Sequence, residues 1–401
     1  MKYEDYVDLT YKPSKNDVIC EFVLKPRGNM VKAAGAVAAE SSIGTWTETT
    51  TTKPAVYRLS AKVYEIKGRR IKIAYPSGLF EKGNLLGLMS SVMGNVFGMK
   101  EVRSLKLVDL ILPRKIVKNF KGPRYGIRGV RRVTGIKKRP LLGTIIKPKV
   151  GLNAREHARV AYEAWVGGCD IVKDDENLTS QSFNKFEKRL KETLKMKERA
   201  ERETGEKKFY MINVTAETFE MLRRAKLVEK SGNEYVMVDS LIVGFSSLLT
   251  LRDRVRTIIH AHRAGHGALT RGENGVSMKV LAKLIRLCGC DQLHVGTVVG
   301  KMFEGIKEVK ENLEAVRGEM YGIKPIMPVA SGGLNQKHVP KIVEIFGNDV
   351  IIQMGGGIHG MKTRIGAAAA RQAIDAVMNN VSLKEYARTH EELRAALRKW
   401  K

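Results

Sequence analysis

The chain has 401 residues, of which 43% are hydrophobic and 28% are charged. These proportions are ordinary for globular proteins and exclude a disordered or fibrous chain. No run approaches the roughly 18 apolar residues of a membrane-spanning helix, and residues 1–17 lack the apolar core of a signal peptide. We therefore expect a soluble, cytoplasmic protein with no membrane segment. The cysteines predict buried thiols and no disulfide framework; they are Cys20, Cys169, Cys288 and Cys290.

The charge balance is unusual, because 71 Lys and Arg residues against 42 Asp and Glu residues give a net charge of +29. Such a surface attracts polyanions but carries no information on the fold. Two function classes therefore stay open, a nucleic-acid-binding protein and an enzyme with a phosphorylated substrate. The densest basic run, residues 114–139, contains 11 Lys and Arg residues and no acidic residue. Because the run includes no nucleic-acid-reading motif, we interpret it as a solvated linker or a surface that faces another subunit.

The first part of the chain mixes strand-like and helical patterns, which predicts a smaller α+β domain over residues 1–125. Helical stretches are expected around residues 30–39 and 85–96. Strand-like runs occupy residues 18–25, 71–76 and 105–113. The second domain is expected to cover residues 126–401.

From residue 141 onward, short β-branched apolar runs alternate with amphipathic stretches of helical length. The eight apolar runs are residues 141–148, 170–176, 209–216, 235–242, 257–263, 292–297, 324–331 and 350–357. Eight such units predict an α/β fold with a closed (β/α)8 TIM barrel. An open doubly wound sheet is the alternative, but no dinucleotide fingerprint follows the first run. The tail, residues 382–401, is expected to form a terminal helix that closes the far side of the barrel.

If these runs form a barrel, their carboxyl ends meet at the face where barrel enzymes hold their active sites. Polar residues and glycines gather at these ends. They are Lys147, Lys149, Lys173, Asp174, Asp175, Glu176, His262, Arg263, His294, Lys301, Ser331, Gly332, Gly333, Gly355, Gly356 and Gly357. Taken singly, each cluster could be a solvated strand end, a turn or a hydrogen-bonded core histidine. Their gathering at one end of the barrel favours a functional site.

The residue types at this end indicate a particular chemistry. Asp175 and Glu176 offer the hard oxygen ligands that Mg²⁺ prefers. Glycine turns after the seventh and eighth runs allow backbone N–H groups to approach a phosphate, and the lysines with Arg263 could hold a second phosphate. A metal between two phosphate sites indicates a bisphosphorylated sugar as substrate.

Seven ordered segments resemble the large chains of ribulose-1,5-bisphosphate carboxylase/oxygenase (RuBisCO), most closely the archaeal form III group. They read AAGAVAAESSIGTWT, GTIIKPKVGL, GGCDIVKDDENLTSQ, IIHAHRAGH, HVGTVVGK, MPVASGG and QMGGGIHG, and the match runs essentially end to end. The resemblance implies addition of CO2 and water to ribulose 1,5-bisphosphate to give two 3-phosphoglycerate, with O2 as a competing substrate. It also implies a place in archaeal salvage of AMP, and a homodimer or a higher oligomer of dimers.

The resemblance assigns roles to matching residues. Lys173 would react with CO2, and its carbamate would bind Mg²⁺ together with Asp175 and Glu176. Lys147 would remove the C3 proton, His262 would act in proton transfer, and Lys301 would close over the added CO2 on a mobile loop. Substrate contacts would come from Lys149, Arg263, His294, Ser331, Gly332, Gly333, Gln353, Gly355 and Gly356. Residues that would complete the site of a neighbouring subunit are Glu40, Thr45, Trp46 and Asn95.

The chain departs from the family pattern at three places. Gly265 stands where a Met is usual, Phe303 stands where a Glu is expected, and the stretch after Gly360 is two residues shorter. The alternative within the fold is a RuBisCO-like enolase or isomerase of a phosphorylated sugar, but such proteins typically lack the lysine at position 301. The distant alternative, a nucleic-acid-binding protein, would need interleaved aromatic residues, and only 6% of the chain is aromatic. We therefore expect carboxylation and no specific nucleic-acid partner.

Overall fold

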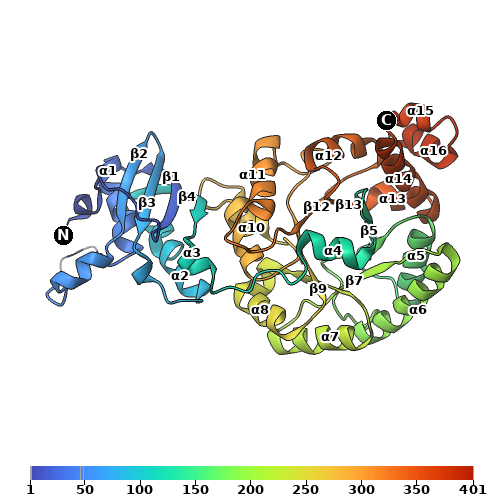
Figure 1. Ribbon diagram of the computed structural model, residues 1–401, viewed down its shortest axis with the longest axis horizontal. Coiled ribbons are helices and arrows are strands. Elements are labelled where there is room, and N and C mark those ends of the chain that lie inside the picture. The colour runs from blue at the N-terminus through green and yellow to red at the C-terminus, as the bar shows by residue number, and fades with distance from the viewer. Residues whose placement is uncertain (1, 46, 48, 401) are drawn as a thin grey trace. The chain divides into compact units, whose positions relative to one another are not determined.

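The computed structural model describes residues 2–45, 47 and 49–400. The chain divides into two compact units (Figure 1). Unit 1 comprises Met1–Lys121, Gly265–Leu287 and Glu319–Ile323, and unit 2 comprises Gly122–Ala264, Cys288–Gly318 and Lys324–Lys401. Within the described ranges, no helix is long and apolar enough to cross a membrane.

Unit 1 contains a sheet of five strands among its described residues, in the order β10-β4-β1-β3-β2. The strands are β1 (Val18–Pro26), β2 (Lys62–Lys67), β3 (Arg70–Tyr75), β4 (Val102–Ile111) and β10 (Gly275–Val276). On β1, alternate residues from Val18 to Leu24 are buried, as expected for a sheet with one face on the core. The three predicted strands are confirmed, and β2 and the two-residue β10 were not predicted.

The helices of unit 1 follow the predicted order, with one difference. Helix α1 (Met30–Glu40) is capped by Asn29, whose side chain accepts a hydrogen bond from the N–H of Lys32 at 3.0 Å. The expected helix over 85–96 is two elements, α2 (Leu85–Val92) and the 3₁₀ turn η4 (Asn95–Gly98), because the backbone leaves the helical region at Gly94. The other elements are η1 (Tyr3–Tyr6), η2 (Pro54–Leu59), η3 (Ser77–Leu79), α3 (Arg114–Val117), α9 (His266–Thr270) and α10 (Met278–Leu287).

Unit 2 is a closed barrel of eight parallel strands in the described part of the chain, so the predicted fold class is confirmed. Each strand lies within one of the eight predicted runs. In chain order the strands are β5 (Leu141–Ile145), β6 (Ile171–Lys173), β7 (Phe209–Asn213), β8 (Tyr235–Asp239), β9 (Ile258–His262), β11 (Gln292–His294), β12 (Met327–Ser331) and β13 (Ile351–Gln353). Neighbouring strands pair in parallel around the ring, and the last barrel strand in the chain, β13, pairs with the first, β5.

Helices surround the strands of unit 2, as Figure 1 shows for α5 to α8. Helix α5 has a capping box, in which Asn153 accepts from the N–H of Glu156 and Glu156 accepts from the N–H of Asn153. The helical elements are α5 (Ala154–Val166), α6 (Phe186–Thr204), α7 (Thr218–Lys230), α8 (Ser240–Arg254), α11 (Ile306–Arg317), η5 (Gln336–His338), α12 (Val339–Phe346), α13 (Gly356–His359) and α14 (Thr363–Met378). Their positions leave the carboxyl ends of the strands free to carry the site.

The amino-terminal end of the barrel is covered by α4 (Gly126–Thr134). Val130 belongs to the apolar cluster formed by the first residues of the strands, such as Leu141 and Phe209, and Tyr125 and Ile127 pack against it. The prediction that the basic run is a solvated linker or a subunit-facing surface is therefore wrong for this part. The apolar residues of the basic run enter the core. A count of its Lys and Arg residues does not reveal this.

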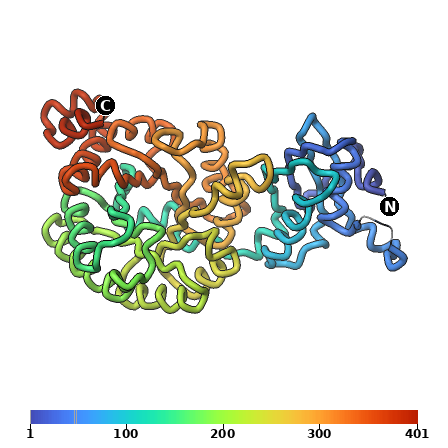
Figure 2. The backbone as a smooth tube through the Cα atoms, turned by 180° about the vertical axis from the view of Figure 1, so that it is seen from behind, coloured from blue at the N-terminus to red at the C-terminus, as the bar shows by residue number. Residues whose placement is uncertain are grey.

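The carboxyl-terminal tail does not close the barrel, so that prediction is also wrong. It forms two short helices, α15 (Leu383–Tyr386) and α16 (Glu391–Lys399), which pack on α14. Figure 2 shows this red segment at the periphery of the barrel and away from its centre. The N–H of Leu393 donates to the side chain of Gln372 on α14 at 2.9 Å, which attaches the tail at this place.

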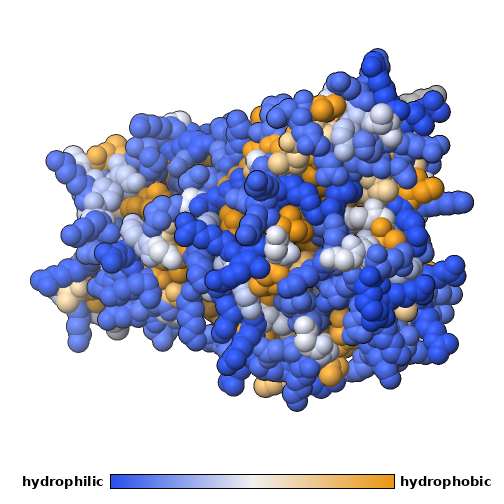
Figure 3. Space-filling view, turned by 45° about the vertical axis from the view of Figure 1, so that its right-hand side comes forward, coloured by the Kyte–Doolittle hydropathy of each residue, from blue (hydrophilic) through white to orange (hydrophobic). Residues whose placement is uncertain are grey.

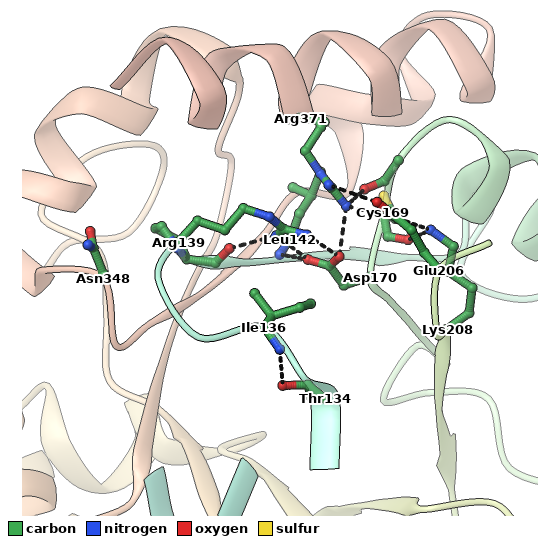
Figure 4. Close-up of polar contacts among 12 residues, drawn as sticks. Thr134, Ile136, Arg139, Leu142, Cys169, Asp170, Glu206, Lys208, Asn348 and Arg371 are labelled. Atoms are coloured by element: carbon green, nitrogen blue, oxygen red, sulfur yellow. Dashed lines mark hydrogen bonds and ion pairs between the residues drawn. The ribbon is translucent and has the colours of Figure 1, made fainter. Parts of the chain in front are cut away.

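Charged side chains join the segments at the amino-terminal end of the barrel (Figure 4). Asp170 accepts two hydrogen bonds of 2.7 Å from the guanidinium of Arg139 and one of 2.8 Å from Arg371 on α14. It also accepts from the N–H of Leu142 at 2.8 Å. Because the carboxylate of Asp170 is 1% exposed and fully paired, it stabilises the fold and is not free to bind a ligand.

Candidate active site

The carboxyl end of β6 places a lysine and three acidic residues in sequence, and each has a different environment. Lys173 is 1% exposed, and its Nζ donates to the carbonyl oxygen of Asp174 at 2.7 Å. Burial lowers the pKa of this amine, although Glu176 and Asp175 act in the opposite direction. Lowering the pKa favours the uncharged amine, which is the nucleophilic form.

Asp174 is part of the scaffold, as its contacts show. Its carboxylate is paired with Arg189 at 3.0 Å and with His157 at 3.0 Å, and it accepts from the hydroxyl of Tyr210 at 2.7 Å. Although burial raises it, these partners hold the pKa of Asp174 well below its ordinary value. The side chain is fully buried and joins the end of β6 to residues of α5, α6 and β7.

Asp175 and Glu176 face the lysines of the mouth. The Nζ of Lys147 lies 2.7 Å from Oδ2 of Asp175, and that of Lys149 lies 3.6 Å from Oε1 of Glu176. Burial raises the pKa of Glu176, but the attraction of Lys173 and His262 outweighs this and lowers it to about 2. The carboxylate of Glu176 is thus available in the anionic form.

His262 is oriented by an acidic residue that the sequence analysis did not select. Its Nδ1 lies 3.0 Å from Oδ1 of Asp239, at the end of β8, and its Nε2 lies 3.7 Å from Oε2 of Glu176. Asp239 is the one acidic residue of the fourth predicted run, 235–242, so this interruption of an apolar run was a signal that could have identified it. The pair fixes the ring so that Nε2 faces the carboxylates of β6.

The loop after β11, residues 297–305, lies against the glycine turn that follows β12. The N–H of Lys301 donates to the carbonyl oxygen of Gly332 at 3.0 Å. A Cβ at Gly333 would lie 2.9 Å from Cβ of Lys301, and one at Gly332 would lie 2.4 Å from Cγ of Met302. Both glycines have positive φ, so a side chain at either would disturb this contact.

The same loop supplies a carboxylate one residue later than the family pattern. Glu304 is 3% exposed, and its Oε1 lies 2.5 Å from Nη2 of Arg263. Phe303, at the position where an acidic residue was expected, is 45% exposed. Glu304 is therefore paired with Arg263, which was predicted to bind substrate. The departure at Gly265 also has a local reason, since its φ of +82° favours glycine over Met.

Three further predicted residues meet near the ends of β13 and β5. Gln353 is buried, and its Oε1 has no hydrogen-bond partner among the described residues. A Cβ at Gly355 would lie 3.1 Å from Cε of Lys147, and Gly356 begins α13. Beside them, His359 bonds the hydroxyl of Thr144 at 3.0 Å. Burial, with the charge of Lys147, lowers the pKa of His359 to about 4, and sequence patterns gave no reason to select it.

His294 and Ser331 are joined directly, with 2.6 Å between Nδ1 and Oγ. The other ring nitrogen of His294 lies 2.9 Å from Nε2 of His260, a buried residue that was not selected. Both nitrogens of the predicted phosphate-proximal histidine are therefore engaged by protein groups. The structure thus brings together in unit 2 all the barrel residues that were predicted to form the site.

Unit 1 holds a separate group of predicted residues. Glu40, Thr45 and Asn95 line one cavity of about 1070 Å³. Nδ2 of Asn95 donates to Oε1 of Glu40 at 3.2 Å, which joins the end of α1 to η4. Trp46 lies outside the described residues. The cavity also contains Lys32 and Lys100, so it combines positive and negative charge.

The donor set at β6 fits a hard cation on one condition. Among the described residues, no group of three His, Cys, Asp or Glu side chains is arranged to hold a metal ion. Asp175 and Glu176 provide two carboxylates, and the third neighbour is the amine of Lys173. The set becomes suitable for Mg²⁺ if that amine is converted to an anionic oxygen donor.

Comparisons with known proteins identify the family of this chain. Residues 126–400 match the model of the ribulose bisphosphate carboxylase large chain, catalytic domain, and residues 5–116 match that of its N-terminal domain. A protein named ribulose bisphosphate carboxylase from Methanocaldococcus jannaschii is 51% identical, and the alignment covers 99% of this chain and 100% of the relative. The protein of that name from Pyrococcus abyssi is 44% identical over 99% of this chain and 96% of its own length.

Solved structures give the same result. The octameric RuBisCO of Pyrococcus horikoshii OT3, in complex with sulfate, superposes with a TM-score of 0.96 at 44% identity, over 100% of this chain and 97% of that one. The dimeric archaeal RuBisCO of Hyperthermus butylicus superposes with a TM-score of 0.92 at 43% identity, over 99% of both chains. The chain therefore belongs to the family of ribulose bisphosphate carboxylase large chains.

Proposed function

We propose that this protein is a ribulose-bisphosphate carboxylase, which adds CO2 and water to ribulose 1,5-bisphosphate and yields two molecules of 3-phosphoglycerate. The observation that carries the proposal is the buried amine of Lys173, with its lowered pKa, beside two carboxylates at the end of β6. In its uncharged form this Nζ attacks the carbon of CO2 and then releases a proton. The product is an anionic carbamate in place of a cation.

The carbamate of Lys173 and the carboxylates of Asp175 and Glu176 would together hold Mg²⁺, which prefers hard oxygen ligands. When bound, the ion supplies Lewis-acid polarisation of substrate oxygen atoms. The activating CO2 is a different molecule from the CO2 that becomes part of the product. This requirement makes activation depend on both CO2 and Mg²⁺.

Lys147 and His262 are proposed to handle the protons. Lys147 removes the proton from C3 of the sugar and later returns a proton to the product. Its contact with Asp175 at 2.7 Å supports this, since it holds the amine beside the proposed metal ligand. His262, with Nδ1 held by Asp239, would exchange a proton through Nε2.

The remaining mouth residues are proposed to bind the substrate. The two phosphates would be held by Arg263 and Lys149 and by backbone N–H groups of the glycine turns at 332–333 and 355–356. His294 would stand close to one phosphate. Hydroxyl groups would contact Ser331 and Gln353, whose Oε1 has no other partner among the described residues. Lys301 would close over the added CO2 and stabilise the developing carboxylate.

We further propose that the active unit is a dimer or an oligomer of dimers, in which Glu40, Thr45, Trp46 and Asn95 complete the site of a partner subunit. The octameric and dimeric states named for the two solved relatives support this. O2 as a competing substrate, and a role in the salvage of AMP, belong to the same proposal and rest on the family resemblance.

The test is incubation with ribulose 1,5-bisphosphate, Mg²⁺ and ¹⁴C-labelled CO2, followed by measurement of acid-stable label in 3-phosphoglycerate. We expect labelled product from the unmodified protein and none from Lys173→Ala. Lys195→Ala, which changes a lysine on α6 whose side chain is 55% exposed, is the matched control and should retain activity. Loss of the C3 proton without labelled product would support the enolase or isomerase alternative instead.

A further inference from the structure

A chain of hydrogen bonds runs through the barrel interior from the proposed site toward its opposite end. Oγ of Ser331 lies 2.6 Å from Nδ1 of His294, and Nε2 of His294 lies 2.9 Å from Nε2 of His260. Nδ1 of His260 then lies 2.9 Å from Oε1 of Gln292, whose Nε2 donates to the hydroxyl of Tyr235 at 3.2 Å. We call these five residues the histidine relay.

The surroundings of both histidines of the relay favour the neutral form. His260 is 0% exposed and His294 is 3% exposed. Burial lowers the pKa of each well below its ordinary value. A neutral imidazole carries one N–H, so each ring has one donor and one acceptor.

The acceptor at one end of the relay therefore sets the direction of every bond. Oε1 of Gln292 can only accept, so Nδ1 of His260 carries the proton and Nε2 of His260 is bare. The nitrogen of His294 that faces it must donate, which leaves Nδ1 of His294 bare. The hydroxyl of Ser331 then donates to that nitrogen.

We propose that Gln292 and His260 are positioning residues that turn the hydroxyl proton of Ser331 away from the substrate and leave its lone pairs to accept. The inference rests on the proposed function, in which Ser331 contacts the substrate. The inference goes beyond the proposed function because it states which kind of substrate group can hydrogen-bond to Ser331. The matching group is a sugar hydroxyl that donates, and a phosphate or carbonyl oxygen at the same place is disfavoured.

The discrimination follows from buried polar groups. A substrate that donates a hydroxyl proton satisfies the oxygen of Ser331, whereas an acceptor would meet lone pairs without a proton between them. His260 and Gln292 lie behind the mouth, on β9 and β11, so they would act on the substrate through His294 and Ser331.

The first test reads the proton positions directly. In protein labelled with ¹⁵N-histidine, NMR should show His294 protonated at Nε2 and bare at Nδ1, with its signals assigned by their loss in His294→Asn. Gln292→Met removes the acceptor at similar size and should give a mixture of tautomers at His294. Tyr235→Phe is the matched control, because it leaves Oε1 of Gln292 in place, and should preserve the tautomer. A proton on Nδ1 of His294 in the unmodified protein would overturn the proposal, even if the variants do not fold.

The second test asks whether Gln292 acts through Ser331. We expect Gln292→Met to lower kcat/KM for ribulose 1,5-bisphosphate about tenfold, as is typical when an outer hydrogen-bond partner is lost. In Ser331→Ala the same change should have no further effect, because the group that Gln292 orients is already gone. Multiplying losses in the double variant would contradict the relay. Absence of turnover in the unmodified protein would refute the carboxylase function, and the NMR result would still decide the proton positions.

Discussion

The buried lysines at the two ends of the barrel have different hydrogen-bond partners. Lys208, just before β7 at the amino-terminal end, pairs with Glu206 at 2.7 Å and donates to the carbonyl oxygen of Cys169 at 3.2 Å. Lys173, at the carboxyl end of β6, donates to a backbone carbonyl oxygen, and burial lowers its pKa. The side chains are about equally buried, so burial alone does not identify a reactive lysine. The two amines differ in their partners, which are an acidic side chain for Lys208 and a backbone carbonyl oxygen for Lys173.

The carboxylates of the two ends show the same contrast. Asp170 at the amino-terminal end is surrounded by Arg139, Arg371 and a backbone N–H, all within 2.8 Å. At the other end, Glu176 lies 3.6 Å from Lys149 and 3.7 Å from His262, which leaves room for another ligand. The surface seen in Figure 3 is largely hydrophilic with scattered apolar side chains, as is usual for a globular protein.

The largest effect is expected at the mouth. Lys173→Ala should abolish carboxylation, because the proposed metal site lacks its third oxygen ligand, and the protein should stay folded. Activity measured after preincubation with CO2 and Mg²⁺ checks this. Full activity without an added small carboxylic acid would remove the proposed metal site.

A second change at the mouth should separate two steps. Lys301→Ala should eliminate carboxylation but spare enolisation, because Lys301 is proposed to stabilise the added CO2 and not to move the C3 proton. Exchange of the C3 proton with solvent measures enolisation, and labelled 3-phosphoglycerate measures carboxylation. Equal loss of both would mean that Lys301 acts earlier or supports the structure.

Mixing two inactive variants should recover part of the activity. Glu40→Ala and Lys173→Ala affect different halves of the proposed shared site, so one interface in a mixed dimer pairs two intact halves. Random pairing gives mixed dimers in half of the cases with one good site in two, so about a quarter of the unmodified activity is the upper expectation. No recovery after confirmed subunit exchange would place each site within one chain.

At the amino-terminal end, the effect should be on stability. Asp170→Ala leaves Arg139 and Arg371 without their shared buried carboxylate, and loss of one partner in such a cluster costs about 3 to 5 kcal/mol. Urea unfolding should show this loss, whereas kcat of the folded fraction should be unchanged. A large fall in kcat at unchanged stability would break the distinction between the two ends.

The smallest effect is expected at the lysine of that end. Lys208→Met should lower the free energy of unfolding by about 1 to 3 kcal/mol, since the hydrogen bonds to Glu206 and to the carbonyl oxygen of Cys169 are both lost, while Arg371 remains near Glu206. Urea unfolding and the carboxylation assay together check it. Loss of carboxylation here would show that burial, rather than the partner, makes a lysine of this barrel essential.

Much of the barrel could be predicted because its strands are continuous apolar runs and its helices are amphipathic. The same periodicity failed for α4, where arginines dominate the composition and a few apolar residues such as Val130 enter the core. It also failed for β10, since two residues that pair with a distant strand leave no local pattern. Pairing between strands that are distant in the chain cannot be predicted from the local pattern of a single sequence.

The site was predicted where charged residues interrupt a strand end or where the family motif names them. Asp239, His260 and Glu304 were not selected, because each acts on a neighbour that is distant in sequence: His262, His294 and Arg263. Such partners become visible only when the strands are placed side by side. The selection therefore found most of the residues that face the mouth and few of those that orient them.

Strand β10 has a consequence for any attempt to isolate the amino-terminal region. β4 would be an edge strand without the pairing of Gly275 and Val276 to Lys106 and Leu107, and Ser277 adds a further hydrogen bond from its N–H to Leu107. A fragment that stops at residue 125 would lack this cover, together with the lysines of α10 that bind Asp109. Its unpaired backbone groups would be open to strands of other copies, so such a fragment should aggregate unless residues 265–287 are supplied as a peptide or a fused segment.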